Sequence, residues 1–211
     1  NGNNMGPSKL VGVAGDHMNY LFYEQDPGRT IPDVRDYQYQ PRTDGVFPEF
    51  HWIDYDINDF YSGKGDLMKS ITDAEDPNLT QFLKDRGGKL IIYHGWSDTL
   101  IVAEDTLDYF NDMVNVTFSG SIAAASESAR LFLAPGMGHC AGGPGPNSWD
   151  KLVPLVDWVE NDVAPSSIIA THSSNGSVDN ERPICAYPQQ ATYTGPTSGQ
   201  NKPENWIAEN F

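Results

Sequence analysis

Two short apolar runs that alternate with two amphipathic helical patterns constrain the fold of this chain more than any other feature. The runs Lys89–Tyr93 and Arg130–Leu133 are bounded by turn residues, as buried strands usually are. Residues 104–114 and 149–160 carry apolar side chains at helical spacing. Pro154 falls inside the second pattern, so that helix either begins late or bends there. The expected buried face of the second helix consists of Leu152, Leu155, Val156 and Val159. This strand–helix–strand–helix order predicts a mostly parallel sheet flanked by helices, an α/β fold.

The segments on either side of this pattern are less regular. Residues 1–63 are rich in turn formers and aromatic side chains, which either pack an irregular segment or form a wall for an aromatic ligand. The acidic run that starts at Asp54 begins like an EF-hand calcium loop. Its sixth position is not glycine and its twelfth, Gly65, is not glutamate, so an EF-hand is excluded. After residue 161 the chain is polar, with one further strand expected at Ile168–Ala170.

The charge balance disfavours two classes of partner. The chain has 13 Lys and Arg against 29 Asp and Glu, a formal net charge of −16. Nucleic-acid binding depends on basic side chains that meet phosphates, so it is disfavoured, as is a basic helix on a membrane surface. No apolar run approaches the roughly 18–20 residues that a membrane span needs. The composition, with 38% hydrophobic residues, predicts a soluble globular protein.

Glycosylation sequons and cysteines indicate in which cellular compartment the protein works. Asn78, Asn115 and Asn175 each begin an Asn-X-Ser/Thr glycosylation sequon, which favours secretion. The first residues lack the basic and apolar regions of a signal peptide, as in a cytosolic protein or a mature secreted one. The cysteines Cys140 and Cys185 either pair with each other, stay free or pair with cysteines outside this chain.

Chemistry-bearing side chains follow each predicted strand. The first strand leads into His94–Asp98 and the second into Pro135–Cys140. Functional groups of α/β sheets gather in loops at the carboxyl ends of strands. An acid at Asp98 followed along the chain by a base at His139 suits a Ser-Asp-His hydrolase. The structural alternatives are that Asp98 caps a turn and that His139 is a surface or core histidine.

No nucleophile accompanies this acid and base. The segment Gly95–Thr99 lacks the second glycine of a Gly-X-Ser-X-Gly elbow, and Ser97 precedes the acid. The order Ser…Asp…His therefore places the serine before residue 1. Cys140 directly follows His139 in the chain, so the two side chains are poorly placed to act as a dyad. His94 and His139 suggest a metal site, but no third ligand has convincing spacing.

Several blocks of the sequence closely resemble the tannase and feruloyl esterase family. They are Arg86–Asp98, Arg130–Cys140, Gly142–Gly145, Asp157–Glu160, Arg182–Cys185 and Tyr187–Pro188. The resemblance extends from about Asp76 to Tyr193. It implies the carboxyl-terminal part of an α/β-hydrolase fold with an inserted lid. Residues 1–65 would be the end of the lid domain, and residues 66–211 the carboxyl-terminal part of the catalytic domain.

The resemblance also implies roles for single residues. It makes Asp98 the acid, His139 the base and Cys140 one half of a disulfide whose other cysteine precedes the nucleophilic serine. That cysteine and serine have no counterpart here. The expected partner is therefore an amino-terminal chain of the same enzyme, separated by a nick in the lid and disulfide-linked through Cys140. Cys185 then bonds either to that chain or to a cysteine trimmed from the carboxyl terminus.

Members of this family hydrolyse esters of phenolic acids, so the resemblance implies a serine esterase, which the sequons indicate is secreted and extracellular. The first hypothesis is a feruloyl esterase that acts on plant cell-wall esters and needs no catalytic cofactor. Any structural calcium of the lid is expected outside this chain. A tannase that cleaves gallate esters is the alternative. The remaining hypotheses are a non-catalytic binding module on the same scaffold and an autonomous hydrolase that uses Ser97 or Cys140.

Overall fold

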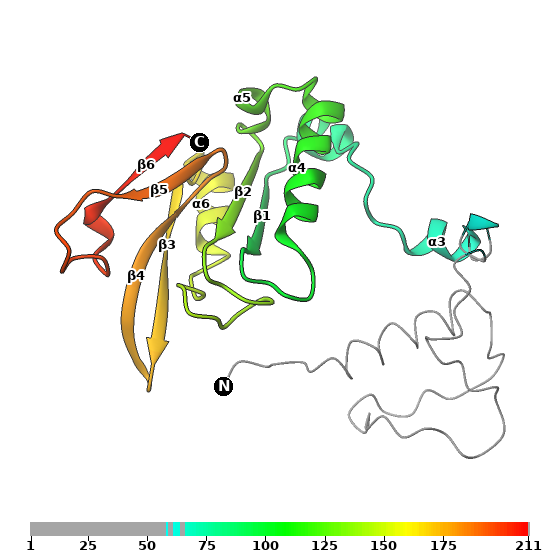
Figure 1. Ribbon diagram of the computed structural model, residues 1–211. Coiled ribbons are helices and arrows are strands. Elements are labelled where there is room, and N and C mark those ends of the chain that lie inside the picture. The colour runs from blue at the N-terminus through cyan, green and yellow to red at the C-terminus, as the bar shows by residue number, and fades with distance from the viewer. Residues whose placement is uncertain (1–57, 59–60, 64–65, 211) are drawn as a thin grey trace, which may run out of the picture. The chain divides into compact units, whose positions relative to one another are not determined.

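The computed structural model describes residues 58, 61–63 and 66–210 (Figure 1). The chain divides into two compact units, and one of them contains Glu75–Phe211. Helix α3 (Asp66–Thr72) belongs to the other unit. The aromatic-rich segment and the acidic run at Asp54 lie almost entirely outside the described residues, so the predicted lid and its boundary at residue 65 stay predictions.

The strand–helix–strand–helix order that was predicted for the middle of the chain is confirmed. A short helical turn, η4 (Gln81–Asp85), precedes strand β1 (Leu90–Gly95). Helices α4 (Ala103–Phe118) and α5 (Ile122–Ala125) follow, then strand β2 (Ala129–Ala134) and helix α6 (Val153–Asn161). β1 and β2 pair in parallel, with Leu90 opposite Ala129 and Gly95 opposite Ala134.

Helix α4 is longer than predicted and buries one apolar face. Phe110, Met113 and Val114 are at most 3% exposed and pack in one cluster with Leu131 of β2. The helix continues to Phe118 and ends at Ser119, whose φ of 53° lies in the left-handed region. That conformation commonly terminates helices, because the following amides then bond the last carbonyls.

Helix α6 begins at Val153 and carries Pro154 in its first turn, where a missing amide hydrogen costs nothing. The predicted buried face was wrong. Leu152, Val156 and Val159 are 65%, 40% and 61% exposed, and Leu155 is half-buried. The residue that the helix buries is Trp158, whose indole packs beneath the cationic ends of Lys89 and Arg130. The large aromatic surface and two cation–π contacts outweigh the small aliphatic side chains in orienting this helix.

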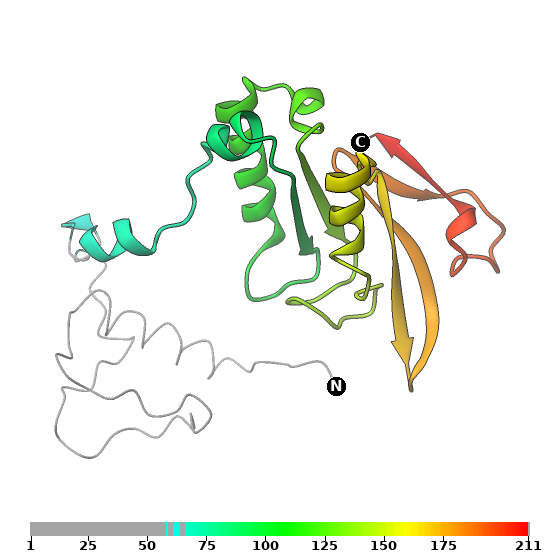
Figure 2. The same ribbon diagram turned by 180° about the vertical axis from the view of Figure 1, so that it is seen from behind.

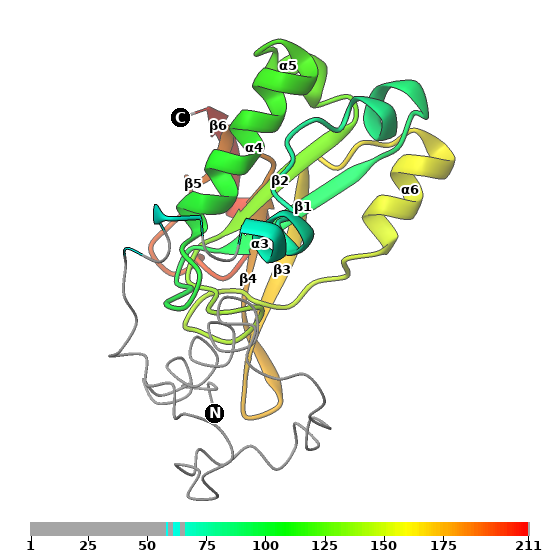
Figure 3. The ribbon, with the colours of Figure 1, turned by 90° about the vertical axis from the view of Figure 1, so that its right-hand side faces the viewer.

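The β1–β2 pair lies between two helices. Figures 2 and 3 show α4 on one side of the pair and α6 on the other. Side chains alternate along β2, as in any strand. Leu131 and Leu133 point into the cluster with α4, whereas Phe132 and Ala134 join a second cluster with Ile168 of β3 and Ile184 of β4. β1 was expected to be a buried central strand, but Leu90–Ile92 are half-buried and Tyr93 is 37% exposed. Among the described strands, β1 pairs only with β2.

The carboxyl-terminal region holds more strands than the sequence predicted. β3 (Ser167–Ser174) pairs antiparallel with β4 (Ser177–Cys185), and β5 (Gln189–Tyr193) pairs antiparallel with β6 (Trp206–Asn210) after a short helix, η5 (Pro203–Asn205). The expected strand at Ile168–Ala170 is the start of β3. The described sheets are therefore not mostly parallel. β2 also contacts the carboxyl-terminal region, through an antiparallel bridge between Phe132 and Ala186.

Candidate functional site

Asp98 and His139, separated by 41 positions in sequence, meet at the carboxyl ends of β1 and β2. His139 Nδ1 lies 2.8 Å from Asp98 Oδ2. The parallel pairing brings the loops after Gly95 and Ala134 to the same edge. Backbone bonds then tie the loops together, since the Trp96 amide donates to Ala134 O at 3.0 Å and the Ser97 amide to Met137 O at 2.9 Å.

Gly95, at the end of β1, packs tightly against the backbone of the loop that follows β2. A Cβ atom on this residue would lie 2.4 Å from Met137 O and 2.7 Å from Gly138 O. Both are backbone atoms, which cannot swing aside as a flexible side chain could. A residue without a side chain at the end of β1 is therefore required for the His139 loop to reach Asp98.

The loop that presents His139 is folded on itself. The Gly138 amide donates to Gly142 O at 3.0 Å, and the Gly145 amide donates to Gly136 O at 3.0 Å. Cys140 has a φ of 61°, in the left-handed region that non-glycine residues rarely adopt. Such strained residues persist where the surrounding structure determines them, and they cluster at functional sites.

The Asp98 carboxylate is surrounded by donors. Its Oδ1 accepts from the amides of Leu100 at 2.8 Å and Ile101 at 3.1 Å. Burial, with the side chain 3% exposed, raises the pKa of this carboxyl. The hydrogen bonds from the two amides and from His139 outweigh burial and lower the pKa to about 2. Asp98 is therefore a carboxylate at any pH at which the protein would work.

The contact with Asp98 determines which nitrogen of His139 carries a proton. A carboxylate only accepts hydrogen bonds, so Nδ1 is the donor and Nε2 is left as the basic nitrogen of the neutral ring. The His139 side chain is 38% exposed, and its Nε2 has no hydrogen-bond partner among the described residues. This arrangement can take a proton from a hydroxyl group placed at Nε2.

A second histidine, which sequence reasoning considered only as a metal ligand, also lies at Asp98. His94 Nε2 is 3.2 Å from Asp98 Oδ2 and 3.0 Å from Ile101 O, and its Nδ1 is 2.7 Å from Thr106 Oγ1. Within the described part of the chain, no group of three His, Cys, Asp or Glu side chains is arranged to hold a metal ion. The sequence feature that could have indicated this contact is the spacing of four residues between His94 on the strand and Asp98 in the turn that follows.

Ser97 and Cys140 are not arranged as nucleophiles. Ser97 is exposed, and among the described contacts no hydrogen bond joins its hydroxyl to His139. Cys140 is also exposed and does not pair with Cys185, which removes the intrachain disulfide from the three possibilities. Cys185 is 6% exposed, and burial raises the pKa of its thiol.

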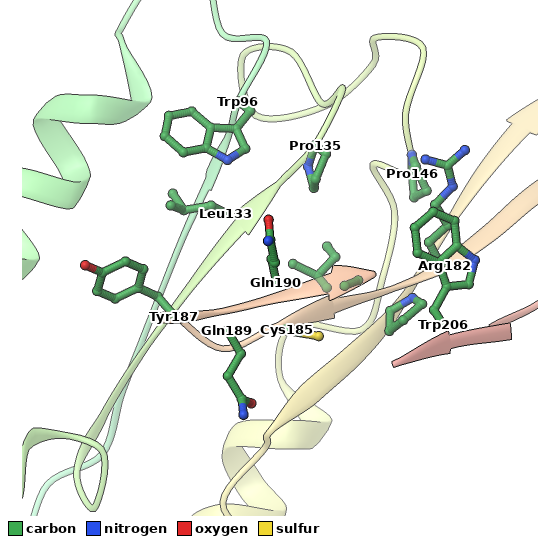
Figure 4. Close-up of a pocket in the computed structure, with 13 residues that line it drawn as sticks. Trp96, Leu133, Pro135, Pro146, Arg182, Cys185, Tyr187, Gln189, Gln190 and Trp206 are labelled. Atoms are coloured by element: carbon green, nitrogen blue, oxygen red, sulfur yellow. The ribbon is translucent and has the colours of Figure 1, made fainter. Parts of the chain in front are cut away.

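A cavity of about 240 Å³ lies beside β2 and β4 (Figure 4). Figure 4 shows Trp96 and Leu133 on one side of it and Arg182 with Trp206 on the other. Cys185 also lines the cavity. Asp98 and His139 are not among the lining residues.

The three sequon asparagines are exposed. Asn78 precedes η4, Asn115 lies on α4, and Asn175 lies in the turn between β3 and β4. Their glycosylation stays a prediction. None of the helices formed by the described residues has the length and apolar character to cross a bilayer.

Comparison with known proteins identifies the family. The model of the tannase and feruloyl esterase family matches residues 50–205. A mono(2-hydroxyethyl) terephthalate hydrolase from Piscinibacter sakaiensis is 42% identical over 151 residues, which cover 68% of this chain and 24% of that protein. Feruloyl esterase B from Aspergillus niger is 34% identical over 148 residues, which cover 63% of this chain and 28% of that protein.

The chain therefore spans about a quarter of the length of these curated relatives. The crystal structure of an esterase from Aspergillus oryzae shares the fold, with a TM-score of 0.68 at 23% identity over 92% of this chain and 37% of that one. Since the family model matches most of its length, the chain belongs to the tannase and feruloyl esterase family.

Proposed function

We propose that this chain provides the acid and base of a secreted serine carboxylic-ester hydrolase that releases phenolic acids such as ferulate from plant cell-wall esters. The observation that carries the proposal is the 2.8 Å contact between His139 Nδ1 and Asp98 Oδ2, which leaves Nε2 as the base. Membership of an esterase family supports it independently.

The proposed reaction has two stages. A serine hydroxyl attacks the ester carbonyl and passes its proton to His139 Nε2. Asp98 stabilises the resulting imidazolium, which then donates the proton to the departing alcohol. Water hydrolyses the acyl-serine by the same route and releases the acid. None of these steps needs a cofactor, and we place any structural calcium of the lid outside this chain.

The nucleophilic serine belongs, in this proposal, to an amino-terminal chain of the same enzyme. A disulfide from Cys140 to the cysteine beside that serine would hold the nucleophile at a fixed distance from His139. The exposure of Cys140 supports this assignment, because an exposed thiol is accessible to a partner chain. Exposed sequons at Asn78, Asn115 and Asn175 are compatible with secretion.

The relatives suggest esters of aromatic acids as substrates. One is a feruloyl esterase and another a mono(2-hydroxyethyl) terephthalate hydrolase, so the shared feature is an aromatic acyl group. We propose ferulate as the acyl group, with gallate, as in a tannase, as the alternative that the family name supports.

Hydrolysis of three esters by the complete enzyme tests this proposal. We expect kcat/KM for methyl ferulate to exceed that for methyl gallate by about tenfold or more. A pocket whose polar groups hydrogen-bond the ferulate acyl group leaves some of them buried and unpaired when it binds a different acyl group. Mono(2-hydroxyethyl) terephthalate is the third substrate, and chromatography of the released acid is the measurement. Preference for gallate would make the enzyme a tannase, whereas no hydrolysis of any ester would favour the binding module.

A further inference from the structure

Two imidazole rings converge on one oxygen of Asp98. His139 approaches Oδ2 from the loop after β2, with Nδ1 at 2.8 Å. His94 approaches the same oxygen from β1, with Nε2 at 3.2 Å. The His94 side chain is 14% exposed, against 38% for His139, so it lies on the protein side of the carboxylate.

The partners of His94 determine its protonation. Nε2 faces two groups that only accept hydrogen bonds, the Asp98 carboxylate and the Ile101 carbonyl, so Nε2 carries a hydrogen and donates it. Nδ1 lies 2.7 Å from Thr106 Oγ1, whose hydroxyl can donate to it. A neutral ring protonated at Nε2 shares its one hydrogen between these two acceptors, and Thr106 on α4 fixes the orientation of the ring.

We propose that His94 is a positioning residue that holds Asp98 Oδ2 in place for His139. This rests on the proposed esterase function. Oδ1 is held by two backbone amides, so without His94 the only donor to Oδ2 among the described residues would be His139. His139 carries the proton in the reaction, and its ring must stay aligned while its charge changes. A second donor from the rigid strand keeps Oδ2 directed at Nδ1 throughout.

The test compares His94→Phe with His94→Gln in the complete enzyme. Phenylalanine fills the ring space without a donor, and the glutamine amide can place an N–H near the position of Nε2. We expect H94F to lower kcat by about 10- to 100-fold with KM unchanged within about twofold, because the lost hydrogen bond acts on the base rather than on substrate binding. H94Q should recover activity to within about threefold of the unmodified enzyme.

A matched histidine provides the control. His172 pairs with Asp179 at 2.6 Å on the β3–β4 hairpin, and its described hydrogen bond involves neither Asp98 nor His139, so His172→Gln should leave kcat unchanged. Should H94F fail to fold, Thr106→Val keeps the histidine and removes only its hydroxyl partner, and kcat should then fall by about 3- to 10-fold. Thermal unfolding of each variant checks its folding.

A readout independent of turnover separates this inference from the proposed function. The hydrogen-bonded Nδ1 proton of His139 is expected as a downfield NMR signal, weakened or broadened in H94F and restored in H94Q. Full activity in H94F, or equal loss in H94F and H94Q, would overturn the positioning role. An active Asp98→Asn variant would overturn the esterase mechanism instead, whatever the His94 variants do.

Discussion

Asp98→Asn and His139→Ala are each expected to lower kcat/KM of the complete enzyme by about 10³- to 10⁴-fold while the fold stays intact. His139→Ala removes the base that we propose accepts the serine proton. Asp98→Asn keeps the shape of the side chain, but its amide NH2 can take the place of the carboxylate oxygen Oδ2. The hydrogen on His139 Nδ1 then loses its acceptor. Initial rates on methyl ferulate, with circular dichroism as the folding check, give the measurement.

His172→Ala is the control for these two variants, because it also removes a histidine paired with an aspartate, at 2.6 Å. It should retain full turnover. The catalytic assignment fails if Asp98→Asn and His139→Ala, correctly folded, keep more than about a tenth of the original kcat/KM, since loss of a general base costs at least about 100-fold.

Gly95→Ala is expected to have the second-largest effect, a loss of at least about 100-fold in kcat/KM. Its added methyl group would lie 2.4 Å from Met137 O, so the loop that carries His139 must move away from the end of β1. That movement separates His139 from Asp98. Overpacking of this kind should also lower the free energy of unfolding by about 1–3 kcal/mol, measured by urea titration.

Leu131→Ala separates the loss of geometry from the loss of stability. Leu131 is fully buried against α4 and lies away from both loops. Its truncation should cost about 2–5 kcal/mol of unfolding free energy, a range that reaches above the one expected for Gly95→Ala. Both variants are assayed well below their unfolding temperatures. If Leu131→Ala then loses as much kcat/KM as Gly95→Ala, the close approach at Gly95 does not explain the loss of activity.

The elements that could be predicted from sequence are those with a clear apolar pattern bounded by turn residues. The runs that became β1 and β2 are bounded by turn residues, and parallel pairing places Asp98 and His139 at one edge. Helix α6 shows where pattern fails, because its aliphatic residues are exposed and a single tryptophan, Trp158, is buried instead.

The antiparallel strand pairs near the carboxyl terminus were not predicted, because their composition is polar. The sequence does contain a signal for the β3–β4 hairpin, since Asn175–Gly176 is an Asn-Gly pair, the preferred two-residue hairpin turn. The structure shows both residues with positive φ, 52° and 81°, as that turn requires. In the sequence, Asn175 was interpreted only as part of a sequon. The contact of His94 with Asp98 was missed because it depends on how the chain turns after β1, which no apolar pattern reports.

The acid and base in this chain are proposed to serve a serine that lies outside it. The most direct test is to label the native protein with a fluorophosphonate, which reacts with activated serines, and to map its peptides without reduction. We predict one labelled serine outside these 211 residues, in a peptide disulfide-linked to the peptide that contains His139 and Cys140. Labelling of Ser97 or any other serine within this chain, or a labelled peptide not bonded to Cys140, would contradict the account.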